Sequence, residues 1–171
     1  MKAHGFTVIE VLVVIIVMAI LLTLAVVNVR STQVNARNTE RITDVENTAL
    51  RLESYYDGPA SSSSGGGSRY PGTNSITLSG LKTLFPDFDL NNVRHPNNDD
   101  TSTIDLVPAT NNKETPSEVT PKPDTETYVY QAINTDGTLC TNNASQSCRR
   151  FNIYYLLEKD STVQVLKSKN R

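Results

Sequence analysis

The chain has 171 residues, which is enough for one domain of ordinary size and an appendage. Its formal net charge of -2 gives no whole-chain attraction to nucleic acid or acidic lipid, so such a partner would need a local basic patch. The apolar residues are concentrated at the N-terminus, whereas the remainder is rich in Thr, Asn and Ser. We therefore expect one loop-rich domain with a modest core behind an apolar N-terminal segment.

The first predicted element is an apolar helix over residues 6–27. Only Thr7, Glu10 and Thr23 interrupt the run, and as a helix it would be roughly 33 Å long, enough to cross a bilayer. The run ends in LAVVNVRS rather than at a small-x-small cleavage site, so it does not fit a secretory signal peptide. A carboxylate such as Glu10 is costly in a membrane unless it has a partner, and the run contains no Lys, Arg or His.

The residues around Glu10 carry a resemblance to a known family. The stretch KAHGFTVIEVLVVIIVMAIL has a short charged leader ending in Gly5, then Phe6, then a glutamate four residues on. It resembles the class III leader of type IV pilins and pseudopilins. The resemblance implies that a prepilin peptidase cleaves between Gly5 and Phe6 and methylates the new amine of Phe6. It also implies that Glu10 meets an N-terminal amine, its own or a neighbouring subunit's, in an assembled filament.

Cleavage would supply the cation that the apolar run lacks. If the helix starts at Phe6, the new amine and Glu10 are one helical turn apart. The simpler interpretation is an acid tolerated close to the membrane interface in a plain single-pass anchor.

The charges that flank the apolar run give a conflicting signal about orientation. Arg30, Arg37 and Arg41 follow the run, whereas only Lys2 and His4 precede it, so the positive-inside rule alone would put the C-terminal part in the cytoplasm. The leader signature is more specific and implies the opposite orientation. We therefore expect a precursor in the cytoplasmic membrane, with its C-terminal domain outside the cytoplasm, and a cell-surface pilus after assembly.

Residues 28–56 are predicted to continue the same helix. They contain no Pro or Gly, and their apolar residues recur at helical spacing. The residues concerned are Ile42, Val45, Ala49, Leu52 and Tyr56. This stripe predicts a face that packs on a sheet, with a coiled-coil contact as the alternative. Arg41 and the neighbouring charges have few partners within the helix, so we expect some of them to pair between packed subunits.

The segments after the helix are predicted to be mostly irregular. A Ser/Gly-rich stretch that begins at residue 57 is flexible by composition. Residues 79–90 are expected to hold a short helix closed by Pro86. Residues 93–126 lack a clear period, and their Pro- and Thr-rich part is expected to form an exposed extended loop.

The C-terminal third is predicted to be an antiparallel sheet. Strands are expected at residues 127–134, 149–158 and 162–167. Asp136 and Gly137 form a hairpin turn signal after the first strand, before a short strand TLC. One face of the second strand carries Phe151, Ile153, Tyr155 and Leu157. This face is suited to covering the amphipathic part of the helix.

Together these elements predict an α+β fold. A long N-terminal helix, transmembrane and then amphipathic, packs on a small C-terminal antiparallel sheet, which is similar to the layout of pilins. The expected organisation is a leader of residues 1–5, a transmembrane and filament-core helix of residues 6–27, its amphipathic continuation over residues 28–56, and an exported globular domain of residues 57–171.

The cysteines and histidines limit the chemistry available to this domain. In an exported protein, Cys140 and Cys148 are expected to form a disulfide that closes a short loop and stabilises it by roughly 2 to 3 kcal/mol. The mature chain would hold one histidine, His95, so it lacks the residues for a catalytic triad or a zinc site. The aspartates of residues 87–89 and 99–100 lie among turn residues. We expect no enzyme, no metal and no cofactor.

A basic bias near the C-terminus raises DNA as an alternative ligand. Its basic residues are Arg149, Arg150, Lys167 and Lys169, and its aromatic residues are Phe151, Tyr154 and Tyr155. Basic groups interleaved with aromatic rings can hold single strands. The competing interpretation is a set of solvated strand charges.

The function expected from the leader and the fold is that of a structural subunit, a pilin, in a type IV pilus that serves adhesion or motility. Its expected partners are copies of itself in a helical filament, a prepilin peptidase, and the pilus or secretion assembly machinery. The alternatives are a pseudopilin of a type II secretion system and a DNA-uptake pilin. A further alternative is a membrane-anchored binding protein that keeps its leader and never assembles.

Overall fold

The structure is a computed structural model that describes residues 6–60, 66–142, 145–160 and 162–170, without the side chains of residues 26–28. It divides into two compact units, Met1–Arg37 and Asn38–Arg171, and each is described here by itself. The predicted leader, residues 1–5, lies outside the described residues.

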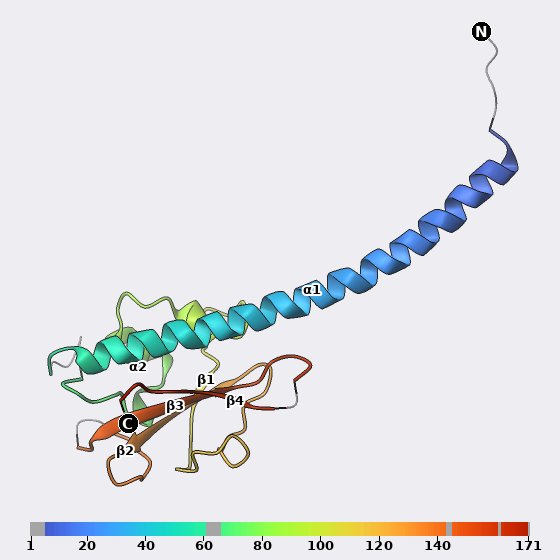
Figure 1. The fold of residues 1–171 in the computed structure, drawn as a ribbon. Coiled ribbons are helices and arrows are strands. Elements are labelled where there is room, and N and C mark those ends of the chain that lie inside the picture. Colours follow the sequence, from blue (N-terminus) through green and yellow to red (C-terminus); the bar gives the residue numbers. More distant parts are fainter. Residues whose placement is uncertain (1–5, 61–65, 143–144, 161, 171) are drawn as a thin grey trace. The chain divides into compact units, whose positions relative to one another are not determined.

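One helix, α1, runs without interruption over Val8–Asp57 (Figure 1). The single long helix predicted from residue 6 to residue 56 is confirmed, although it begins two residues later. In the first unit, every described side chain of residues 6–25 is exposed to solvent. By length and composition, α1 is able to cross a membrane. A helix that is apolar all round needs a lipid or protein environment to cover it.

The second unit contains a four-stranded sheet in the order β1-β2-β3-β4 (Figure 1). Its strands are Leu106–Pro108, Tyr128–Asn134, Cys148–Tyr155 and Gln164–Lys167. The pairs β2/β3 and β3/β4 are antiparallel, as predicted, and the turn at Gly137 has a positive φ of 83°. The first strand, β1, joins β2 in parallel and makes the sheet mixed. Its three residues, which end in Pro108, are too few to produce a recognisable alternation.

Short helices fill the connection between α1 and the sheet. These are η1 (Thr73–Ser75), α2 (Leu78–Leu84) and η2 (Leu90–Val93). The helix α2 is the one predicted before Pro86, and the hydroxyl of Thr77 caps it by accepting from the N–H of Gly80 at 3.0 Å.

The main core lies between the C-terminal part of α1 and one face of the sheet. The helix contributes Val45, Ala49, Leu52 and Tyr55, and the strands contribute Tyr128, Tyr130, Ala132, Phe151 and Ile153. The predicted stripe is confirmed for Val45, Ala49 and Leu52, whereas Ile42 is only partly buried and is not part of this core, and Tyr55 rather than Tyr56 is the buried tyrosine. The predicted strand face is also confirmed for Phe151 and Ile153.

The opposite face of the sheet is covered as well, which the sequence did not predict. Ala109 and Val119, from the Pro- and Thr-rich segment, pack on Val129 and Tyr154 and are 3 % and 1 % exposed. Most of this segment is irregular and exposed, as predicted, but these two buried residues anchor it on the sheet. All seven residues of β2 are consequently buried.

A buried amide network ties the covering segment to the sheet. The side-chain Nε2 of Gln131 donates to the carbonyl oxygens of Asn111 (2.8 Å) and Lys113 (3.1 Å), and its Oε1 accepts from Asn152 and Tyr154. A fully satisfied polar group of this kind specifies how the segment sits on the strand.

Of the helix charges among which some are expected to pair between subunits, Arg41 is paired within its own unit. Arg41 is 1 % exposed, and its guanidinium bonds to Glu158 and to the carbonyl of Thr125 within the same unit. The positive charge of Arg41 is therefore paired inside the folded domain.

Candidate functional site

The N-terminus of α1 is closed by reciprocal hydrogen bonds between two side chains and the backbone. The backbone N–H and the hydroxyl of Thr7 both donate to Oε2 of Glu10, at 2.8 Å each. The backbone N–H of Glu10 donates in return to Oγ1 of Thr7 at 3.3 Å. Thr7 is therefore the N-cap, and Glu10 the N3 residue, of a capping box. The negative charge of Glu10 also lies at the end of the helix dipole that favours it.

The cap uses only part of the hydrogen-bonding capacity of Glu10. Its Oε1 accepts no hydrogen bond from a described residue, so one carboxylate oxygen is available to a further donor such as an amine. The sequence prediction treats Thr7 as a mere interruption of the apolar run. The T-x-x-E spacing before an apolar run is nevertheless a capping-box signature and identifies Thr7 as the missed residue of this site.

Phe6 precedes the cap and is 88 % exposed. Together with Val11 and Leu12 it lines an open apolar groove, which is the placement of a hydrophobic staple around a helix N-terminus. Because α1 begins at Val8, Phe6 and Glu10 are separated by the N-cap rather than by a regular helical turn. Gly5, the residue predicted to precede the cleavage, lies outside the described residues.

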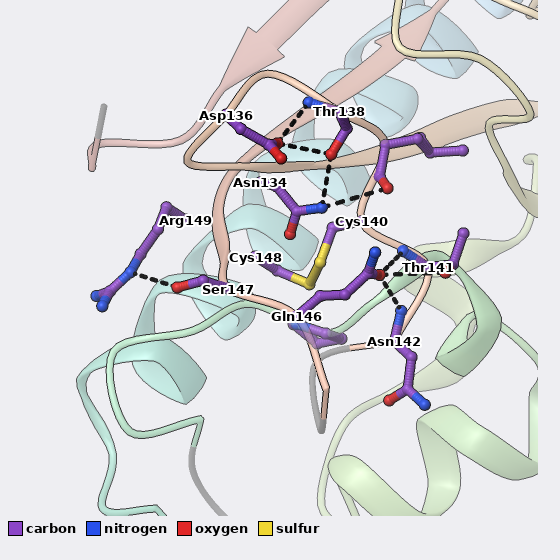
Figure 2. The surroundings of a disulfide bond; sticks show 12 residues. Asn134, Asp136, Thr138, Cys140, Thr141, Asn142, Gln146, Ser147, Cys148 and Arg149 are labelled. Atoms are coloured by element: carbon purple, nitrogen blue, oxygen red, sulfur yellow. Dashed lines mark hydrogen bonds between the residues drawn. A yellow bond between two sulfur atoms is a disulfide. The ribbon is translucent and has the colours of Figure 1, made fainter.

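The predicted disulfide between Cys140 and Cys148 is present (Figure 2). Both cysteines are completely buried. Within the loop that the disulfide closes, Oε1 of Gln146 accepts from the backbone N–H groups of Thr141 and Asn142 and from the hydroxyl of Thr141, at 2.8 to 3.1 Å. The described part of this loop is thus held by one amide as well as by the covalent bond.

The segment that follows the Ser/Gly-rich stretch packs along both cysteines. The N–H of Tyr70 donates to the carbonyl of Cys148 at 2.8 Å, and the N–H of Thr73 donates to the carbonyl of Cys140 at 3.0 Å. Between them, a Cβ on Gly72 would lie 2.5 Å from the carbonyl oxygen of Thr141. Glycine is required here by the close approach of two backbones rather than by its φ angle.

The basic residues near the C-terminus are distributed over several pockets. Arg149 and Arg150 line one cavity, Lys167 and Lys169 line a groove between β4 and α1, and Arg150 and Lys167 share a further pocket with Glu114. Of the aromatic rings that the sequence places beside them, Phe151 and Tyr154 are 0 % exposed, whereas Tyr155 is partly exposed.

A buried carboxylate holds the C-terminal segment on α1. Glu53 is 8 % exposed and accepts from the hydroxyl of Tyr70 (2.7 Å) and the backbone N–H of Lys169 (2.8 Å). Asn170 donates to the same tyrosine oxygen at 3.0 Å. Burial first, and then the neighbouring Glu53, raise the pKa of the Tyr70 phenol well above its ordinary value. Tyr70 therefore stays a hydrogen-bond donor at any physiological pH.

The aspartate-rich loops contain no obvious metal centre. No group of three or more His, Cys, Asp or Glu side chains lies close enough to hold a metal ion within the described ranges. His95 instead accepts from the backbone N–H of Asn97 at 3.2 Å, and Asp100 accepts from Ser102. These are the local contacts of turns.

An apolar N-terminal helix with a capped glutamate, followed by an α+β domain, is the arrangement expected of precursors of the type IV pilin and pseudopilin kind. In agreement, residues 1–26 match the family described as the prokaryotic N-terminal methylation motif, which is the class III prepilin leader. Proteins with this leader are structural subunits rather than enzymes. No curated protein and no solved structure matches the chain.

Proposed function

We propose that the chain is the structural subunit of a type IV pilus. It is inserted in the cytoplasmic membrane, cleaved after Gly5 by a prepilin peptidase, methylated at Phe6 and assembled into a filament that serves adhesion or motility. The observation that carries the proposal is the exposure of every described side chain of residues 6–25 behind the matched leader. Such a surface is stable only in lipid or in a bundle of like helices.

The physical logic of assembly follows from the N-terminal helix. Moving from the membrane to a filament exchanges lipid contacts for contacts with neighbouring helices, so packing and polar pairing decide the register. Glu10 is the one carboxylate in residues 6–27, and an unpaired carboxylate in an apolar bundle is costly. The Oε1 of Glu10, to which no described residue donates a hydrogen bond, suits an N-terminal amine of a neighbouring copy as its partner.

The C-terminal domain favours assignment as a pilin over assignment as a pseudopilin. A disulfide-closed loop near the C-terminus is similar to the pilin layout, and here it is buried at both sulfurs and packed on the segment of Tyr70 and Thr73. A domain stabilised in this way suits a filament exposed outside the cell.

The test is the intact mass of this protein in filaments sheared from the cell surface, measured with N-terminal peptide mapping before and after reduction. We expect a chain that starts at methylated Phe6 and gains two hydrogen atoms on reduction. A Gly5→Leu variant is the control, because a blocked cleavage should keep the leader and remove the protein from the sheared fraction. Processed protein found only in membranes would favour a pseudopilin instead, and an uncleaved N-terminus in the unaltered chain would refute the proposal.

A further inference from the structure

A β-bulge lies where β3 begins. Ile133 of β2 pairs with Arg150, and the next residue, Asn134, pairs with Cys148, so Arg149 has no partner on β2. In a regular strand the side chains of neighbouring residues point to opposite faces. A bulge changes that alternation and re-aims a side chain. Here, Arg149 and Arg150 both line one cavity.

This cavity has a volume of about 590 Å³, and its lining is polar and basic. Besides the two arginines, it is lined by Tyr56, Thr135 and Asn170. None of these side chains is acidic. The volume lies in the range typical of sites for small ligands.

The guanidinium of Arg149 is held in place without being neutralised. Its Nε donates to the hydroxyl of Ser147 at 3.0 Å, and its Nη1 donates to the carbonyl of Ser68 at 2.8 Å and to the hydroxyl of Tyr56 at 3.4 Å. All three acceptors are uncharged, and Nη2 donates to no described residue. Figure 2 shows the side chain bonded to Ser147 and pointing away from the disulfide. The positive charge of Arg149 is thus held in place by the protein itself, without a ligand.

The second arginine is paired with an acid beside the cavity. Nη2 of Arg150 lies 3.2 Å from Oε1 of Glu114 and Nη1 lies 3.5 Å from Oε2, and the two side chains are 31 % and 32 % exposed. An incoming anion therefore has to compete with the Glu114 carboxylate for this guanidinium.

We propose that the cavity binds the carboxylate of an acidic saccharide. Guanidinium groups recognise carboxylates through paired hydrogen bonds, and two arginines belong to this lining. The Thr135 hydroxyl, the Asn170 amide and the Tyr56 hydroxyl belong to the same lining and are the groups that bind sugar hydroxyls. This proposal does not depend on filament assembly, since the whole cavity lies within the unit Asn38–Arg171.

The same geometry argues against a nucleic acid strand. Binding a strand requires exposed aromatic rings and a basic groove that follows the backbone. Phe151 and Tyr154 are completely buried and Tyr155 is partly buried, while Arg150 and Lys167 share a pocket with the acidic side chain of Glu114. None of these three rings is fully exposed, so they offer no platform on which successive bases could stack.

The experiment titrates the purified full-length protein, in detergent micelles, with glucuronate and follows binding by calorimetry and ligand-observed NMR. Glucose tests for neutral sugar, acetate tests for the carboxylate alone, and a thymidine oligonucleotide tests for nucleic acid. The variants are Arg149→Gln and Arg150→Gln, and the matched control is Lys82→Gln, which removes one exposed positive charge from α2 and does not line the cavity. Intact mass without reduction and circular dichroism verify that each variant keeps the disulfide and the fold.

We expect glucuronate to bind more tightly than acetate, and glucose not to bind. Each arginine variant should weaken glucuronate binding about tenfold, as expected for the loss of a charge-assisted contact, and Lys82→Gln should not. Arg149→Lys, which keeps the charge but loses the planar donor group, should bind more weakly than the unaltered chain. The proposal is overturned if glucuronate does not bind at millimolar concentration, if acetate binds equally well, if Lys82→Gln has the same effect, or if the oligonucleotide displaces glucuronate.

Discussion

The guanidinium of Arg41 and the carboxylate of Glu158 lie 3.0 Å apart although 117 residues separate them in sequence. The same guanidinium donates from Nε (3.2 Å) and Nη2 (2.8 Å) to the carbonyl of Thr125, and Asn38 beside it bonds to the backbone of Glu158. One buried arginine thus joins α1 to the segments that precede β2 and follow β3. Its partners are inside the domain, so its role is to stabilise the fold.

The first prediction concerns this arginine. Arg41→Met keeps most of the side-chain volume but leaves the Glu158 carboxylate and the Thr125 carbonyl without their donor. Breaking a buried pair from one side costs about 3 kcal/mol, which should appear as a clear fall in the thermal unfolding temperature of the full chain in detergent. The matched control is Lys82→Met on the exposed side of α2, which should have little effect. Equal stability of the two variants would contradict the structural role.

The second prediction separates the two roles of Glu10. Glu10→Gln keeps an oxygen that can accept the Thr7 hydrogen bonds but removes the negative charge. Thr7→Val removes the hydroxyl of the cap and keeps the charge. If Glu10 pairs with an amine of a neighbouring copy, Glu10→Gln should leave processed protein in the membrane and strongly reduce sheared filaments, whereas Thr7→Val should reduce them far less. An equal loss of sheared filaments in both variants would mean that the capping role alone explains why the apolar helix carries Glu10.

The third prediction concerns the close approach at Gly72. A methyl group there would lie within 2.5 to 2.7 Å of the backbone of Thr141 and Asn142, and backbone atoms cannot rotate away. Gly72→Ala should therefore destabilise the domain by about 1 to 3 kcal/mol. Gly137→Ala is the control, because that position has open space and only a positive φ of 83°, which costs about 1 kcal/mol. Thermal unfolding without reductant compares the two variants. An unchanged unfolding temperature of Gly72→Ala would show that the segment of Gly72 separates easily from the segment of Thr141 and Asn142.

The fourth prediction concerns the disulfide. Replacing both Cys140 and Cys148 by serine should lower the free energy of unfolding by roughly 2 to 3 kcal/mol, since the closed loop is short. Because both sulfurs are buried, two hydroxyls in their place add a cost of their own. Denaturant unfolding of the unaltered chain, with and without reductant, gives the matched comparison. Coincident unfolding curves in the two conditions would contradict a stabilising role.

The fifth prediction is a dependence of stability on pH. Burial first, and then the charges of Glu40 and Asp89, raise the pKa of Asp44 to about 7, against a smaller opposite effect of Arg41. The folded state therefore retains a proton that the unfolded state releases near its ordinary value. Stability from this group is fully present below that ordinary value and is lost as the pH rises through about 7.

Asp44→Asn removes this titration, so its unfolding temperature should fall less than that of the unaltered chain between pH 5 and pH 8. The effect is moderated by solvent, because the side chain is only half-buried. Asp87→Asn, in an exposed loop, is the control and should leave the pH profile unchanged. A profile of Asp44→Asn identical to that of the unaltered chain would contradict the prediction.

Several features of the fold could be predicted because they leave a local pattern in the sequence. The apolar run and the stripe from Val45 to Leu52 predict one helix by their spacing alone. The Asp136-Gly137 signal and the alternation around Phe151 predict the antiparallel strands in the same way. The capping box at Thr7 is also a local pattern, and the spacing to Glu10 is enough to identify it.

By itself, the sequence determined the leader, the long helix, the α+β class and the pairing of the two cysteines. Only the tertiary structure decided that Arg41 is neutralised by Glu158, that β1 pairs in parallel with β2, and that a bulge brings Arg149 and Arg150 to one cavity. The physical reason is the sequence separation of the contacts. The periodicity of apolar residues is local and shows which face of a helix or strand is apolar. The burial of a charge and the register of strands instead depend on contacts between residues far apart in the chain.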